Sequence, residues 1–300
     1  MSKKVPDSGV SAKFGYFPQH CQVEGEHFQI QTLPGFEEYC RSIEKSESRS
    51  NEWVYPSTGR IFGLPKTHAL TLYNNESIAE IEFIVWCISF FNGIRLTTTQ
   101  AGFLDATPIT VGKLVDFVLI NRSGMADIIS ISLSYIRGHR DNQKALKRVA
   151  AIIHALFLAQ SPRNLPFEKF QYLYMALDCC YRLVFEGEAG INKDIPHSRR
   201  VEWMCKNFGM PVPHWANSSV ATEKRLTDIR NDTFHEALFF GEPLGFALSS
   251  GNQLAGRPGN ILLEMQALVC RLLVAILGKA DTTYVKSPIN TRQHIGLDLV

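Results

Sequence analysis

The sequence lacks a strong excess of either charge. Its 31 Lys and Arg residues are balanced by 29 Asp and Glu, which leaves a formal charge of +2 over 300 residues. A protein that depends on phosphate contacts over much of its surface usually carries a clear basic excess. The balance excludes that class of protein, so any contact with nucleic acid must be confined to a local group of residues.

Long uninterrupted apolar segments are also missing. No apolar run follows the two lysines near Met1, so we expect neither a signal peptide nor an anchor there. Of the two most apolar segments, 81–94 is too short to cross a bilayer and 261–277 is interrupted by Glu264, Gln266 and Arg271. Both are expected to be buried helices, in a cytoplasmic protein with no contact to a membrane.

Paired cysteines and cofactor motifs are absent too. The cysteines number seven, an odd count, and none is spaced as Cys-x-x-Cys, so neither a disulfide framework nor a zinc knuckle is indicated. No phosphate-binding loop, dinucleotide fingerprint or spaced set of metal ligands stands out. We therefore expect reduced thiols, no metal and no cofactor.

The first half of the chain predicts an α+β domain over residues 21–138. Spacings of three and four between isoleucines predict a helix from about 78 to 88. Residues 1–20 and 283–300 lack sustained periodicity and are expected to be loosely ordered tails. β-branched and aromatic runs predict strands at 28–31, 68–73, 117–120 and 128–135.

The second half predicts an all-α domain over residues 139–282. Several helices joined by loops can bury their apolar stripes only against one another, so a helical bundle is the expected architecture. Apolar spacing predicts helices at about 141–160, 166–187, 199–207, 220–239 and 261–277.

The helix expected near 220–239 carries reactive side chains away from its apolar stripe. On a helical wheel Asn231 and His235 share the outer face, one turn apart. Arg230 lies about 140° from His235, near the edge of the apolar stripe, if the helix is regular. Either the helix loosens near Phe234, or two chains share one site.

The string Arg230-Asn231-Asp232-Thr233-Phe234-His235 resembles the Arg-x4–6-His signature of the HEPN superfamily, in which Asn, Asp or His often follows the arginine. The similarity covers about 141–280 and implies an all-α HEPN-like bundle after the α+β module. Members with this motif are metal-independent endoribonucleases of toxin–antitoxin, abortive-infection and CRISPR systems. The resemblance therefore implies a ribonuclease of antiphage defence or a toxin–antitoxin pair.

These residue types suit cleavage of RNA by attack of the ribose 2′-hydroxyl. An imidazole with a pKa near 6.5 can transfer a proton, and a guanidinium can hold a phosphate and offset developing charge. The resemblance implies that Arg230 binds phosphate, Asn231 positions it and His235 is the general acid/base, which leaves a 2′,3′-cyclic phosphate. It also implies a homodimer with a composite active site, an antitoxin or phage-derived trigger, and a regulatory or sensing N-terminal domain.

Other interpretations remain open. Lys193 and the segment His197-Ser198-Arg199-Arg200 form a basic cluster that can follow an RNA backbone, although a short cluster on a surface loop is more often only solvated. The motif itself fits a non-catalytic HEPN-like module that binds nucleic acid or protein. A metabolic enzyme in the α+β half has no paired carboxylates or ligand cluster to support it.

Overall fold

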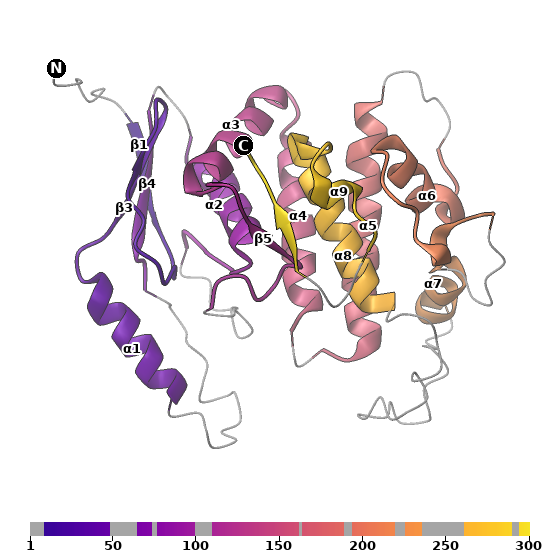
Figure 1. Cartoon of the computed structure of the whole chain (residues 1–300), viewed down its shortest axis with the longest axis horizontal. Coiled ribbons are helices and arrows are strands. Elements are labelled where there is room, and N and C mark those ends of the chain that lie inside the picture. Colours follow the sequence, from indigo (N-terminus) through magenta and orange to yellow (C-terminus); the bar gives the residue numbers. More distant parts are fainter. Residues whose placement is uncertain are drawn as a thin grey trace. The chain divides into compact units, whose positions relative to one another are not determined.

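The fold is mixed α+β, with a small antiparallel sheet near the N-terminus followed by helices (Figure 1). Contacts divide the chain into two compact units. The first comprises Met1–Val115, Leu119–Asp141 and Leu299–Val300, and the second comprises Asp116–Val118 and Asn142–Asp298. The computed structural model describes residues 9–48, 65–73, 77–99, 110–161, 164–188, 194–219, 226–235, 261–289 and 294–300.

The sheet of the first unit has the strand order β1-β4-β3-β2, and every neighbouring pair is antiparallel. Ile30 pairs with Leu70 and Phe28 with Leu72, which places large apolar side chains on one face because alternate residues point to the same side. The predicted strands at 28–31 and 68–73 are confirmed. The four strands are β1 (Gly9–Phe14), β2 (Val23–Glu24), β3 (Phe28–Thr32) and β4 (His68–Tyr73).

Helices complete the first unit. α1 (Phe36–Ser48) follows β3, and α2 (Ile78–Asn92) packs on β1 and β4 and against α3. Ser77 and Glu80 form a capping box at the start of α2, and Gly93 ends it with a left-handed φ of 62°. The helix predicted from about 78 is therefore confirmed.

The strand predicted at 128–135 is wrong, because this segment is the helix α3 (Met125–Gly138). Isoleucines and serines alternate there with the period of a strand. The hydroxyls of Ser130 and Ser132 each donate to a carbonyl four residues earlier, at 2.7 Å. A serine that satisfies its own hydroxyl inside a helix can replace an apolar residue at little cost, so the alternation was misleading.

The second unit is a helical bundle centred on α5 (Pro166–Gly187). This helix packs against α4 (Gln143–Ala159), α8 (Ile261–Val274) and α6 (His197–Asn207), while α7 (Leu226–His235) packs on α6 (Figure 1). The apolar helix from Ile261 to Lys279 is long enough to cross a membrane, but most of it is buried, as in the core of a soluble protein.

The two ends of the chain differ from the expected loose tails. In the N-terminal segment Phe14, Tyr16 and Phe17 are buried, and the short apolar–polar alternation of residues 9–14 forms the edge strand β1. In the C-terminal segment Tyr284 and Leu297 are fully buried. The expectation is therefore wrong for 9–20 and for the described parts of 283–300, which contain α9 (Thr283–Lys286) and β6 (Ile295–Leu297), the partner of β5 (Phe117–Leu119).

Candidate functional site

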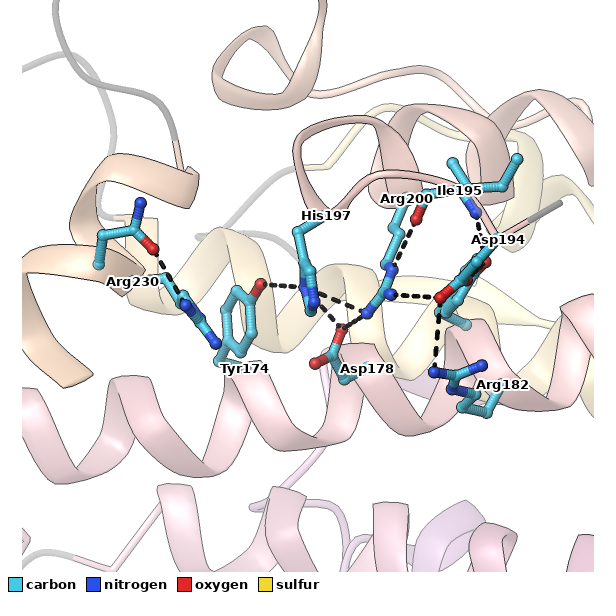
Figure 2. Close-up of polar contacts among 10 residues, drawn as sticks. Tyr174, Asp178, Arg182, Asp194, Ile195, His197, Arg200 and Arg230 are labelled. Carbon is cyan, nitrogen blue, oxygen red and sulfur yellow. Dashed lines mark hydrogen bonds and ion pairs between the residues drawn. The ribbon is translucent and has the colours of Figure 1, made fainter. Parts of the chain in front are cut away.

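A stripe of polar side chains runs along one face of α5. Tyr174, Asp178 and Arg182 recur every four residues, so they project from the same side of the helix (Figure 2). The apolar side of α5 is buried and includes Phe170, Leu173, Leu177 and Val184. The stripe is the part of α5 that meets the start of α6.

The first turn of α6 places two side chains against this stripe. Pro196 precedes the helix with φ −55° and ψ 142°, and its carbonyl accepts from the backbone N–H of Arg199 at 2.8 Å. His197 and Arg200 are three residues apart and therefore project from one side of the helix. Figure 2 shows both side chains directed toward Asp178.

Arg200 is an internal side chain and not the exposed RNA contact that was expected. Its side chain is only 9% exposed. Nη1 donates to Asp178 Oδ1 at 3.0 Å, Nη2 donates to Asp194 Oδ2 at 3.3 Å, and Nε donates to the Ile195 carbonyl at 3.0 Å. The guanidinium also lies over the Tyr181 ring, 4.3 Å from its centre. The expectation failed because the segment is a helical turn facing two carboxylates and not a surface loop.

The other members of that basic cluster lie elsewhere. Arg199 is exposed on α6, so it remains compatible with the predicted contact. Lys193 lies outside the described residues.

His197 lies at the centre of the polar cluster. Its Nδ1 atom is 3.1 Å from Tyr174 Oη, 3.1 Å from Arg200 Nη1 and 3.7 Å from Asp178 Oδ1. Burial and the charge of Arg200 lower the pKa of His197, although Asp178 acts in the opposite direction. Burial raises the pKa of Tyr174 to about 12. At neutral pH the imidazole is therefore uncharged and the phenol keeps its proton.

α7 presents Arg230 to the same cluster. Leu226 and Ile229 are buried, as the helical wheel predicted. Arg230 is half-buried, and its positive charge contributes to the lowered pKa of His197. Phe234 links the helices, since its ring centre is 6.0 Å from that of Tyr174 and 5.7 Å from the Arg230 guanidinium carbon.

The two remaining motif residues differ in what the structure describes. Asn231 is exposed, as predicted, and its Oδ1 accepts from Arg230 Nη1 at 3.0 Å. α7 remains helical up to His235, so the described helix does not loosen at Phe234. The His235 side chain lies outside the described part of the chain.

A shallow pocket is formed where α5, α6 and α7 meet. Its polar lining joins the phenol of Tyr174, the carboxylate of Asp178, the imidazole of His197 and the guanidinium of Arg200. The apolar lining consists of Leu177, Val201, Met204 and Leu226. Within the described ranges no group of three or more His, Cys, Asp and Glu side chains is arranged to hold a metal ion.

No known family model, characterised protein or solved structure matches the chain. The site is therefore defined by its own geometry. The sequence indicated Arg230 and Asn231 as site residues and His197 only as part of a basic segment, and it did not indicate Tyr174 or Asp178. The available signal was the four-residue spacing of polar side chains in the otherwise apolar α5, together with His197 three residues before Arg200.

Proposed function

We propose that the chain is a metal-independent endoribonuclease of HEPN type that cleaves RNA by attack of a 2′-hydroxyl on the adjacent phosphate. The observation that carries the proposal is the position of Arg230 on α7, from which its charge acts on Tyr174 and His197, two of the side chains that line the pocket with Asp178. A guanidinium beside such hydrogen-bonding groups suits a phosphodiester, whose oxygens gain charge during cleavage.

Each motif residue has a distinct role in this proposal. Arg230 binds the scissile phosphate, and Asn231 positions its guanidinium through the 3.0 Å hydrogen bond. His235 is the general acid/base that moves a proton between the 2′-hydroxyl and the leaving 5′-oxygen. DNA is spared because it lacks the 2′-hydroxyl.

The proposal includes a homodimer with a composite site. In a regular helix residues five positions apart point about 140° away from each other, so Arg230 and His235 of one α7 do not converge on one phosphate. Two chains related by a two-fold axis bring Arg230 of one copy to His235 of the other.

The proposed setting is the cytoplasm, in abortive infection or a toxin–antitoxin system. In this proposal an antitoxin or a phage-derived trigger controls the ribonuclease activity. The first unit regulates that activity or senses the trigger. This part of the proposal is supported by the resemblance of the Arg230–His235 motif.

Cleavage assays with the purified full chain test the enzyme. We expect wild-type protein to cut tRNA, mRNA or rRNA in the presence of EDTA. Arg230→Ala and His235→Ala are each expected to lower the rate by at least about a hundredfold, because each removes a group that acts in the transition state. His214→Ala, which changes an exposed histidine of the second unit, is the matched control.

Mixing the two inactive variants tests the composite site. A heterodimer of Arg230→Ala and His235→Ala chains contains one intact Arg–His pair out of two. Random pairing makes half of the dimers heterodimers, so equal co-expression is expected to restore about a quarter of the wild-type activity. Variants that fold and bind RNA as the wild type does while also cleaving it normally would contradict the proposal. Wild-type protein that binds RNA without cutting it would favour the non-catalytic binding module.

A further inference from the structure

The hydrogen bonds of His197 determine where its proton lies. A guanidinium has donors only and accepts no hydrogen bond. Arg200 Nη1 lies 3.1 Å from Nδ1 of His197, and this contact is a hydrogen bond only if Nδ1 accepts. A neutral imidazole with an accepting Nδ1 carries its proton on Nε2. The contact with Arg200 therefore favours the Nε2–H tautomer of His197.

The surroundings of His197 oppose a second proton. The charged groups around it are Asp178 on α5, Arg200 on its own helix, Arg230 on α7 and Asp194 before α6. A second proton has to bind Nδ1, where the Arg200 N–H already points and Tyr174 Oη lies at 3.1 Å. Asp178 is the nearest carboxylate, but its Oδ1 is shared with Arg200. The site thus maintains an uncharged donor.

The Nε2–H group is available to a ligand. The His197 side chain is 43% exposed and lines the pocket between the three helices. All of its hydrogen bonds to the described residues involve Nδ1. The buried Arg200 and the half-exposed Asp178 contact the Nδ1 side of the ring. The donor is therefore held in place, and Tyr174 lies between the His197 ring and Arg230, whose charge acts on His197 (Figure 2).

We propose that His197 is a second RNA-contacting imidazole, whose Nε2–H donates to an oxygen of a phosphate that Arg230 binds. The inference rests on the proposed function and adds to it a contact within one chain. Tyr174, Asp178 and Arg200 are positioning residues in this inference, because their contacts orient the His197 ring. The role differs from that of His235, since His197 stays neutral and transfers no proton.

The first test is the tautomer itself. Long-range ¹H–¹⁵N correlation spectra of the full chain, with the His197 signals assigned by their loss in His197→Gln, are expected to show an unprotonated Nδ1 and a protonated Nε2 at pH 7. A proton on Nδ1, or an imidazolium at that pH, would overturn the inference whatever the activity of the protein.

The second test separates hydrogen bonding from proton transfer. The glutamine amide retains an N–H donor near the position of Nε2, whereas alanine has none. Binding of a single-stranded 2′-O-methyl RNA, which resists 2′-hydroxyl attack, is expected to weaken about tenfold or more in His197→Ala and less than about threefold in His197→Gln. His214→Gln is the matched control, and melting temperatures verify folding.

The outcomes distinguish this inference from the proposed enzyme. Normal binding by His197→Ala, or equal loss in both variants, overturns the role of His197 even if the wild type cleaves RNA. If His197→Ala binds RNA more weakly than His197→Gln does, but the wild type cleaves no RNA, the His197 contact is supported and the nuclease activity is contradicted. Absence of RNA binding by the wild type overturns both.

Discussion

Two arginines of the second unit have contrasting surroundings. Arg200 directs its donors at two carboxylates and a backbone carbonyl of its own chain. Arg230 is half-buried on α7 and donates to Asn231, an exposed neighbour on the same helix. A guanidinium saturated by internal acceptors fixes structure, so Arg200 orients His197 while Arg230 is the one proposed to bind phosphate.

His68 predicts a pH dependence of stability in the first unit. It is fully buried on β4, its ring nitrogens contact Thr67 Oγ1 at 3.0 Å and Thr32 Oγ1 at 3.2 Å, and burial lowers its pKa to about 4. Unfolded histidine titrates near 6.5, so the unfolded chain binds the proton more tightly. The stabilisation is present above pH 6.5 and is lost as the pH falls toward 4.

We expect the free energy of unfolding to fall by about 2 kcal/mol between pH 7 and pH 5 from this group alone. Urea denaturation of the full chain at the two pH values measures it. His68→Gln is expected to remove that part of the pH dependence. A variant with the same loss as the wild type would show that another group is responsible.

Asp116 connects three elements of the second unit. It lies directly before β5 and accepts from Arg271 Nη1 of α8 at 2.6 Å and from the Tyr284 hydroxyl of α9. Arg271 is fully buried, so Asp116→Ala leaves an unpaired buried charge. We expect this variant to lose about 3–5 kcal/mol of stability in chemical denaturation.

A matched control exists near the same elements. Asp281 forms an ion pair with Lys286 at 3.5 Å, but its side chain is fully exposed. Asp281→Ala is expected to change stability by less than about 0.5 kcal/mol. Similar effects of the two substitutions would contradict a structural role for the buried network.

Elements with a strong periodic pattern were predictable, and those fixed by distant contacts were not. α2, α4 and α5 have apolar residues at helical spacing and clear end signals, and each begins within a few residues of its predicted start. α3 was misread because its serines bond to their own helix. β1, α9 and β6 are short and owe their burial to segments far away in the sequence.

At the scale of the whole molecule the candidate site joins residues that are distant in the chain. The Arg-x4–6-His motif indicated Arg230 and Asn231, which belong to one helix. Tyr174, Asp178 and His197 converge only because α5 and α6 pack together. The same packing directs Arg200 at Asp178 and Asp194, and the position of the basic residues in the sequence does not indicate these partners. The nearly neutral composition agrees with a site limited to one pocket.

Attack by the 2′-hydroxyl is tested most directly with one RNA that has a mapped cleavage site and with the same RNA carrying a single 2′-deoxy nucleotide on the 5′ side of that linkage. We expect a 2′,3′-cyclic phosphate end on the first substrate and no cleavage at the substituted linkage of the second. Equal cleavage of both substrates, or products that end in a 3′-hydroxyl, would contradict it.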